Sequence, residues 1–219
     1  MPRASAMIGP IVRLRVLRPS ARTPADLLLF GVTVVELGIL LWTTPAFGIA
    51  DWIYVSQHLL VLGFALTRAA PRVQDRSPLS AAAVVVSYAY PYAQVIYIKR
   101  VPDEPVWVAG GLVLVTLAAC LSCASLLALG RRFGIRPALR DLVTRGPYRI
   151  VRHPIYLSYV LADIGYNLQG WNPGTVLMVL AGWASLIYRI QAEERVLARD
   201  AGWSRYAGTV RSRLLPGLW

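Results

Sequence analysis

Six apolar stretches dominate this chain, and they limit what it can fold into. A helix needs about 20 residues to cross roughly 30 Å of hydrocarbon. The first four stretches reach about that length, and the last two are shorter and are joined by an uncharged turn. The stretches are Leu27–Phe47, Ile49–Thr67, Leu79–Ile98, Val106–Gly130, Ile155–Gly170 and Val176–Tyr188, the last continuing as helix to about Arg199. The pattern predicts an all-α integral membrane protein with about six transmembrane helices, the last two a short helical hairpin, followed by a C-terminal cytoplasmic helical segment.

The composition favours a membrane protein over a water-soluble domain. Of the 219 residues, 56% are hydrophobic and only 16% are charged, whereas soluble domains carry about 25% charged residues. A water-soluble fold of this length cannot hide so much apolar surface, because much of any folded surface stays exposed. The chain therefore needs a bilayer to cover part of its surface.

Basic residues lie almost entirely on one side of the predicted spans. All of them except Lys99 and Arg100 lie in the N-terminal arm, in the loops after the second and fourth stretches, or from Arg189 onward. Because Lys and Arg concentrate in cytoplasmic loops, this bias predicts that both termini are cytoplasmic. The net charge of +12 would suggest a nucleic-acid partner in a soluble protein. Here contact with anionic membrane lipids explains it, and no nucleic-acid partner is expected.

Four ionisable residues fall inside or at the edge of the apolar stretches, namely Glu36, His58, Asp163 and Arg189. Ionisable groups in a bilayer are costly and commonly mark function. Glu36 and His58 can simply pair with each other, and Asp163 can pair with a neighbouring helix or line a cavity. Their roles therefore stay open. Arg189, at the cytoplasmic end of its stretch, can extend its charge to the membrane interface.

Two further groups of residues in the stretches have ordinary structural explanations. Cys120 and Cys123 share one helix face, but two ligands do not make a zinc site, and no metal is expected. Pro91 is surrounded by four tyrosines, Tyr88, Tyr90, Tyr92 and Tyr97. A helix kink and an interfacial aromatic belt account for them. A surface that lines a substrate is the alternative for these tyrosines.

The loop before the fifth stretch, residues 142–156, is unusually polar for this chain. Pro154 suits the first position of a helix, and the preceding His153 is driven out of the helical conformation. His153 therefore lies at a helix N-terminus, where free backbone N–H groups favour anions. Arg152 adds positive charge. The loop predicts a pocket for an anionic small molecule at the cytoplasmic interface.

A second polar stretch follows the sixth apolar stretch and contains Glu193 and Glu194. Adjacent helical residues point about 100° apart, so these two carboxylates cannot do the same job. One can face a ligand while the other pairs with an arginine. A solvated helix end that leaves the membrane is the alternative.

Together these stretches resemble the isoprenylcysteine carboxyl methyltransferase family and the related phospholipid methyltransferases. The resemblance covers roughly Leu129–Trp219, including the chain's ending. Its motifs are Gly146-Pro147-Tyr148-Arg149, Arg152-His153-Pro154-Ile155-Tyr156 and Glu193-Glu194-Arg195-Val196-Leu197. Trp203, where many members have tyrosine, and Ser158, often glycine, depart from the pattern without removing a charged ligand.

The resemblance implies an integral membrane methyltransferase that uses S-adenosylmethionine and takes a lipophilic or small-molecule acceptor from the bilayer. The cofactor would lie at the cytoplasmic ends of the last helices, closed over by the C-terminal segment. Motif positions assign cofactor binding to Leu142, Val143, Gly146, Tyr148, His153, Tyr156, Glu193 and Glu194. They assign catalytic contact with carboxylates of cofactor or substrate to Arg152 and Arg189.

These inferences divide the chain into a basic arm at residues 1–24, four transmembrane helices at 25–130 and a methyltransferase-like region at 131–219. A carboxylate of the isoprenylcysteine type is the expected acceptor, with a phospholipid amine or a small thiol as alternatives. An NADPH-dependent membrane reductase of the sterol type is disfavoured, because Pro154 stands where such enzymes show a different pattern. A non-enzymatic membrane protein is the third alternative, and the oligomeric state is open.

Overall fold

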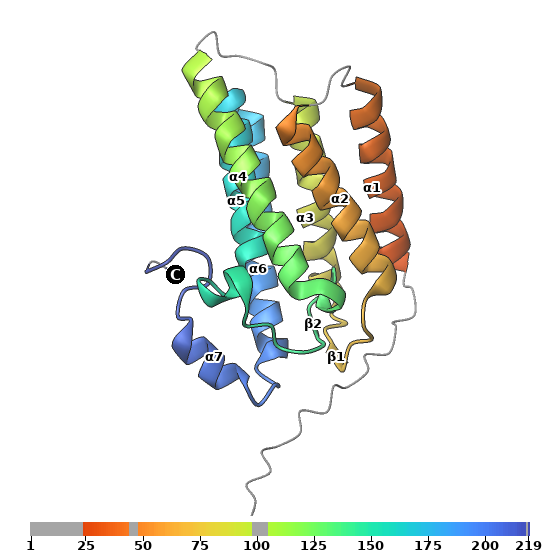
Figure 1. The fold of residues 1–219 in the computed structure, drawn as a ribbon, viewed down its shortest axis with the longest axis vertical. Coiled ribbons are helices and arrows are strands. Elements are labelled where there is room, and N and C mark those ends of the chain that lie inside the picture. The colour runs from red at the N-terminus through yellow and green to blue at the C-terminus, as the bar shows by residue number, and fades with distance from the viewer. Residues whose placement is uncertain (1–23, 44–47, 98–104, 218) are drawn as a thin grey trace, which may run out of the picture.

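The computed structural model describes residues 24–43, 48–97, 105–217 and 219, and they are mostly helical (Figure 1). Six long helices form a bundle, and a short one follows near the C-terminus. These helices are α1 (Pro24–Thr43), α2 (Ile49–Thr67), α3 (Pro78–Tyr97), α4 (Pro105–Leu129), α5 (Pro154–Gln169), α6 (Pro173–Leu197) and α7 (Trp203–Thr209). Each predicted apolar stretch therefore forms a helix, and α6 does continue beyond its apolar part. The basic arm, residues 1–24, lies outside the described residues apart from Pro24.

The all-α prediction missed one small element, a pair of two-residue strands. Strand β1 (Val73–Gln74) pairs antiparallel with β2 (Ala138–Leu139). The strands connect the loop after α2 to the loop after α4, and no hydrophobic periodicity announces elements this short. The same loops are joined by Arg140, whose Nε donates to the Ala69 carbonyl oxygen over 2.9 Å.

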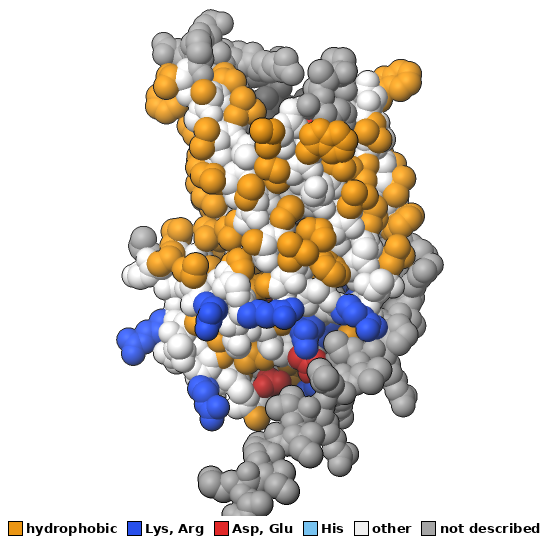
Figure 2. Space-filling view, viewed as in Figure 1, with side chains coloured by type: hydrophobic (Ala, Val, Ile, Leu, Met, Phe, Trp, Pro, Cys, Tyr) orange, Lys and Arg blue, Asp and Glu red, His pale blue; other side chains and the backbone are white. Residues whose placement is uncertain are grey.

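Two of the described helical segments are long and apolar enough to cross a membrane by length and composition, namely Val106–Arg132 and Pro173–Leu197. Leu29–Trp42 is apolar but shorter. The side of the bundle in Figure 2 is largely hydrophobic, with Lys and Arg side chains in a row across its lower part. Many large apolar side chains are exposed on the surface, among them Trp42, which is 91% exposed. Such a surface is typical of a membrane-facing one.

The helices α5 and α6 are consecutive, yet each packs mainly on a different partner. Helix α5 lies along α4, and α6 lies along α3. Glycines allow both approaches. A Cβ atom at Gly111 of α4 would lie 2.5 Å from the Gly165 carbonyl oxygen of α5, and one at Gly182 of α6 would lie 2.5 Å from the Tyr90 ring of α3. Small residues let helix backbones come close where no hydrophobic effect drives them together.

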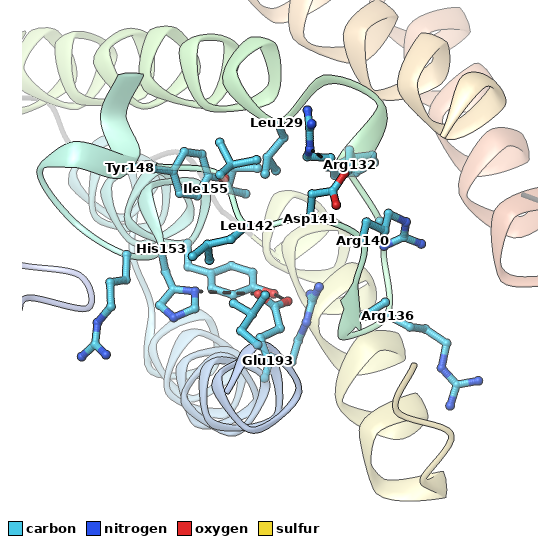
Figure 3. A pocket seen from close by; sticks show the side chains of 18 of the residues that line it. Leu129, Arg132, Arg136, Arg140, Asp141, Leu142, Tyr148, His153, Ile155 and Glu193 are labelled. Atoms are coloured by element: carbon cyan, nitrogen blue, oxygen red, sulfur yellow. Dashed lines mark hydrogen bonds and ion pairs between the residues drawn. The ribbon is translucent and has the colours of Figure 1, made fainter. Parts of the chain in front are cut away.

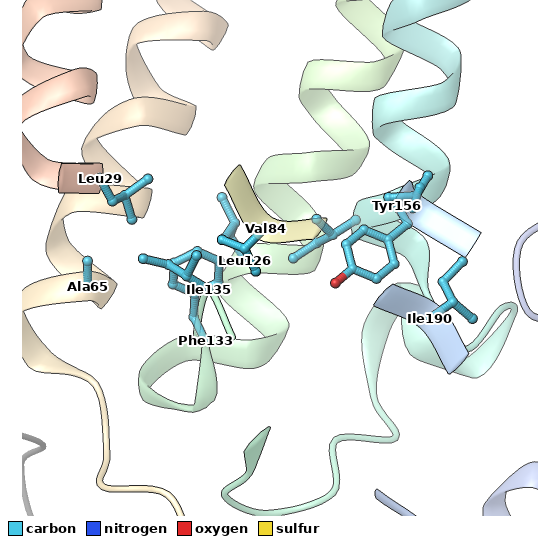
Figure 4. Close-up of a cluster of buried hydrophobic side chains, with 10 residues drawn as sticks. Leu29, Ala65, Val84, Leu126, Phe133, Ile135, Tyr156 and Ile190 are labelled. Atoms are coloured by element: carbon cyan, nitrogen blue, oxygen red, sulfur yellow. The ribbon is translucent and has the colours of Figure 1, made fainter. Parts of the chain in front are cut away.

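A buried apolar cluster fills the end of the bundle next to the β1–β2 pair (Figure 4). Leu126 of α4 and Ile190 of α6 are almost completely buried in it. Phe133 and Ile135 enter it from the loop after α4, so that loop is part of the core and is not free to move away. The cluster therefore fixes the loop that carries much of the polar chemistry described below.

Neighbouring glycines on α4 give a matched test of the α4–α5 contact. We expect Gly111→Ala to destabilise the protein by about 1–3 kcal/mol, because the added methyl overlaps the backbone of α5. Gly110→Ala meets nothing within 4 Å, and its better helix propensity should leave stability unchanged or raise it by up to about 1 kcal/mol. Thermal unfolding in detergent measures both. Equal stabilities for the two variants would show that α4 and α5 do not approach at Gly111.

Candidate active site

The loop between α4 and α5 is shaped by two glycines and by the start of α5. Gly130 and Gly146 have φ angles of 52° and 59°, in the left-handed region that favours glycine. After Gly146 a short 3-10 turn, Gly146–Arg149, leads to His153, the residue before α5, which is non-helical at φ −128°. Pro154 then occupies the first helical turn. The predicted local structure of this loop is therefore confirmed.

A pocket lies between this loop, the polar C-terminal end of α6 and helix α7 (Figure 3). We call it the end pocket; its empty volume is about 890 Å³ including its open mouth. Pockets for small molecules commonly enclose about 300–1,000 Å³. Its polar lining side chains are those of Tyr88, Arg132, Arg136, Arg140, Asp141, Tyr148, Arg152, His153, Tyr156, Tyr159, Arg189, Glu193 and Tyr206. In Figure 3 His153, Leu142 and Glu193 converge, whereas Arg136 points away from them.

The end pocket brings together most of the residues predicted from the motifs. Leu142, Val143, Tyr148, Arg152, His153, Tyr156, Arg189 and Glu193 line it. Gly146 and Glu194 do not. Gly146 acts through its backbone conformation, and Glu194 lies behind the lining among cationic side chains.

The adjacent glutamates divide their work as their spacing predicts. Glu193 faces the end pocket, where its carboxylate accepts a hydrogen bond from the Tyr156 hydroxyl and lies 3.7 Å from His153 Nδ1. Glu194 instead pairs with Arg152 Nη1 at 3.1 Å and Arg213 Nε at 3.0 Å, and its Oε1 lies 3.3 Å from His153 Nε2. The Glu194 carboxylate thus supplies an anion at the N-terminus of α5, where the sequence predicts that an anion binds. The geometry therefore gives Glu193 the ligand-facing position and Glu194 a structural one, a different division from the motif assignment.

The C-terminal segment closes one side of the end pocket. The backbone N–H groups of Arg152 and His153 donate to the carbonyl oxygens of Ser212 and Arg213, each over 2.9 Å. The Tyr206 hydroxyl of α7 donates to the Tyr148 carbonyl oxygen over 2.8 Å. Burial raises the pKa of Tyr206 to about 12, so this hydroxyl stays a neutral donor at physiological pH. Tyr206 therefore holds the loop against α7.

Arg189 is the most unusual residue of the site. Its side chain is buried, with the residue 3% exposed, and its Nη2 donates to the Ile135 carbonyl oxygen over 3.0 Å. Its guanidinium carbon lies 5.1 Å from the Tyr156 ring centroid and 5.8 Å from that of Tyr88. Within the described residues its Nε and Nη1 have no hydrogen-bond partner. Because an unpaired buried cation is costly, these two donors would be satisfied by an anion.

Two further spaces adjoin the end pocket. The central cavity has lining residues from all six long helices, among them Glu36, His58, Tyr88, Asp163 and Arg189, and the lateral groove runs between α1 and α3. The walls of the groove are largely apolar. They comprise Leu29, Gly31, Val32, Val35, Glu36, Ile39, Ala81, Val84, Val85, Tyr88, Ala89, Ile135 and Arg136. Tyr88 lines all three spaces, and Arg189 lines the end pocket and the central cavity.

Sequence reasoning alone does not single out several residues of these spaces. Arg132 and Asp141 reach the end pocket because the β1–β2 pair holds their loop, and Asp141 is paired there with Arg72 and Arg132. Tyr159 lies one helical turn beyond Tyr156 on α5, and that spacing is the signal that could have found it. Tyr88 was recognisable only as one of several tyrosines near Pro91.

The fold and the site define a class: a helical, membrane-type protein with a polar pocket at one end of its bundle and an apolar groove beside it. Residues 111–199, which include most of α4, the loop and all of α6, match the model of the isoprenylcysteine carboxyl methyltransferase (ICMT) family. The resemblance inferred from the motifs is confirmed for this region. The match does not include α1, α2 or α3.

Curated relatives agree with the family match. A probable protein-S-isoprenylcysteine O-methyltransferase from Oryza sativa subsp. indica is 33% identical over 112 residues, 48% of this chain and 59% of the relative. Protein-S-isoprenylcysteine O-methyltransferase A from Arabidopsis thaliana is 29% identical over 115 residues, 48% of this chain and 58% of the relative. Form B from the same plant is 25% identical over 146 residues, 59% of this chain and 74% of the relative. The chain thus spans about three fifths of the length of the first of these relatives.

The two glutamates give a test of the site's architecture. We expect Glu194→Gln to lower stability by about 1–3 kcal/mol, because Arg152 and Arg213 then lose the charge that compensates them. Glu193→Gln keeps an oxygen that can accept from Tyr156, so it should change stability by less than about 0.5 kcal/mol. Thermal unfolding of the ligand-free protein distinguishes the two. A larger loss for Glu193→Gln would contradict the assigned positions.

Proposed function

We propose that this protein is an integral membrane methyltransferase that uses S-adenosylmethionine to methylate the carboxylate of a lipophilic acceptor. The observation that carries the proposal is the buried Arg189 guanidinium, whose two unpaired donors lie where the end pocket meets the central cavity. An arginine fork binds a carboxylate through two parallel hydrogen bonds. The family match supports the reaction class.

The residues of the end pocket suit the proposed cofactor. The apolar side chains of Leu142, Val143 and Leu197 offer a surface for an adenine ring. The Glu193 carboxylate can accept from a hydroxyl or an amine, and Arg152, whose buried Nε has no partner among the described residues, can donate to a carboxylate. Tyrosine faces attract a cation such as a sulfonium, and Tyr156 belongs to this wall. When bound, the cofactor supplies an activated methyl group on a positively charged sulfur.

The chain's own part in the reaction is alignment and exclusion of water. Transfer of the methyl group to a carboxylate oxygen would form a C–O bond as the C–S bond of the cofactor breaks. The negative charge of the acceptor and the positive charge of the sulfonium cancel, and no proton is released. A general base is therefore unnecessary. Arg189 would hold the acceptor carboxylate, and the closed loop and C-terminal segment would keep water out.

The lateral groove supplies a route for the apolar part of the acceptor. Val35 and Ile39 of α1 and Val85 of α3 give it apolar walls, and Tyr88 connects it to the end pocket. A hydrocarbon tail in the groove would stay in contact with lipid while the carboxylate reaches Arg189. Burial of such a tail contributes about 0.8 kcal/mol per CH₂ group.

A titration with S-adenosylhomocysteine tests the cofactor, and Arg189→Lys tests the acceptor role. We expect the ligand to stabilise the protein by about 2.7 kcal/mol at a hundredfold excess over its dissociation constant. Lysine keeps the charge of Arg189 but not its fork, so turnover of S-farnesylcysteine should fall about ten- to a hundredfold. The dissociation constant of S-adenosylhomocysteine should change less than about threefold, since we expect lysine's charge to suffice there.

The matched control for this experiment is Arg195→Lys, an exposed arginine on the same helix, which should change neither quantity. Full turnover by Arg189→Lys, or complete loss of S-adenosylhomocysteine binding in that variant, would show that Arg189 does not hold the acceptor. Absence of S-adenosylhomocysteine binding to the unaltered protein would contradict the proposed function itself.

We also propose that all six long helices cross the membrane with both termini cytoplasmic. The supporting observation is that Lys and Arg side chains gather across one end of the bundle (Figure 2), and that arginines of the loop after α4 also line the end pocket. In a protein whose Cys120 and Cys123 are replaced by alanine, Arg76→Cys should react with an impermeant maleimide from the cytoplasmic side only. Trp171→Cys, in the turn between α5 and α6, should react from the opposite side only. Labelling of both from the same side would overturn this topology.

A further inference from the structure

Three parts of the chain hold the Arg189 guanidinium. Its Nη2 donates to the Ile135 carbonyl oxygen over 3.0 Å, and its carbon atom lies 5.1 Å from the Tyr156 ring centroid and 5.8 Å from that of Tyr88. Ile135 belongs to the loop after α4 and Tyr156 to α5, both within the residues that match the ICMT family. Tyr88 belongs to α3, so it is a contact that a helix outside the match makes with this cation.

The two tyrosine contacts restrain Arg189 without using its hydrogen-bond donors. An aromatic face attracts a cation electrostatically and offers it no lone pair. A guanidinium carries five N–H groups in one plane, and within the described residues Arg189 Nε and Nη1 have no hydrogen-bond partner. The rings of Tyr88 and Tyr156 can therefore fix the position of the cation while these N–H groups stay available for a carboxylate.

Polar contacts fix the register of α3 against α6 beside Tyr88. The hydroxyl oxygens of Ser87 and Ser185 lie 2.8 Å apart, and each lies 2.7 Å from the Ala83 carbonyl oxygen. Ser87 is the neighbour of Tyr88, and Ser185 lies about one helical turn before Arg189 on α6. Tyr88 cannot move along α6 away from Arg189 without breaking these contacts.

Tyr88 also lies on the route proposed for the acceptor. It lines the lateral groove and the end pocket as well as the central cavity, and it packs against the buried apolar cluster. An acceptor whose tail lies in the groove and whose carboxylate reaches Arg189 therefore has the Tyr88 ring beside it.

We propose that Tyr88 is a positioning residue for the acceptor: its ring holds the Arg189 guanidinium in the orientation that binds the acceptor carboxylate. This inference rests on the proposed function and adds to it a residue of α3. Without the ring, Arg189 keeps its charge but is free to turn toward the central cavity, where the Asp163 carboxylate lies. Binding of the carboxylate then suffers, because a bidentate ion pair depends on alignment. Binding of the cofactor does not.

The experiment compares N-acetyl-S-farnesylcysteine with its carboxamide, which keeps the tail and lacks the negative charge. Their dissociation constants are measured in nanodiscs with S-adenosylhomocysteine bound, so that no methyl transfer occurs. The ratio of the two constants isolates the carboxylate, since a changed groove wall affects the tail of both ligands alike. We expect the unaltered protein to bind the carboxylate at least about tenfold more tightly.

Tyr88→Leu should lower this carboxylate preference about five- to tenfold, because it removes a cation–π contact with a buried cation. Tyr88→Met, which also lacks an aromatic face, gives a second variant with the same expectation. Tyr88→Phe keeps the ring and should change the preference by less than about twofold. In turnover of N-acetyl-S-farnesylcysteine, Tyr88→Leu should raise KM about tenfold and change kcat by less than about threefold. Its dissociation constant for S-adenosylhomocysteine should also stay within about threefold.

The matched control is Tyr90→Leu, the same change on the same helix. Tyr90 also contacts α6, since a Cβ atom at Gly182 would lie 2.5 Å from its ring, but it lines neither the end pocket nor the lateral groove. Its hydroxyl donates to Asp163 over 2.8 Å, so this variant should be less stable than the unaltered protein. It should nonetheless keep the carboxylate preference.

Three outcomes would overturn the inference alone. They are a full carboxylate preference in Tyr88→Leu or Tyr88→Met, an equal loss in Tyr88→Phe, and an equal loss in Tyr90→Leu, which would mean that any loosening of α3 against α6 suffices. If the unaltered protein does not prefer the carboxylate, or does not bind S-adenosylhomocysteine, the proposed function fails and this inference fails with it.

Discussion

The carboxylate of Glu194 holds together segments that are far apart in sequence. It lies on α6 and pairs with Arg152 from the loop before α5 and with Arg213 from the C-terminal segment. Backbone hydrogen bonds from Arg152 and His153 join the same two segments, the loop before α5 and the C-terminal segment. Without this carboxylate three cationic or donor groups would face one another half-buried, and the wall of the end pocket would separate. Because these pairs fix Glu194, they also fix the orientation of α6 that points the adjacent Glu193 into the end pocket.

Much of the fold follows from the apolar pattern. The six stretches each form a helix, and Pro154 and Pro173 start α5 and α6 as proline does at a first turn. Membrane crossing is a stronger claim than helix formation, and by length and composition only α4 and α6, among the described helices, meet it. The choice of partners was beyond the pattern. A stripe of apolar residues predicts that a helix packs on something. The close approach of Gly111 to Gly165 shows that α4 packs on α5.

The motifs predict the candidate site about as well as the apolar pattern predicts the fold. The loop and the Glu193–Glu194 pair could be assigned to one pocket, and the division of labour between adjacent helical residues followed from the 100° step between them. The sequence does not predict which glutamate faces the pocket. That depends on the pairing of Glu194 with Arg213, which lies nineteen residues later in a segment without helical periodicity. Arg132 and Asp141 were equally hidden, since the two-residue strands that position them carry no sequence signal.

The chemistry and the selectivity of the proposed enzyme come from different parts of the chain. Residues 111–199, the part matched to the ICMT family, supply Arg189, the proposed partner of the acceptor carboxylate. They also supply His153 and Glu193, which line the pocket proposed for the methyl donor. Helices α1 and α3 lie outside that match and build the lateral groove. Because Tyr88 of α3 lines all three spaces, it is the point where the unmatched half of the bundle can act on the reacting carboxylate. A chain can therefore keep its reaction class while α1 and α3 change the acceptor that reaches Arg189.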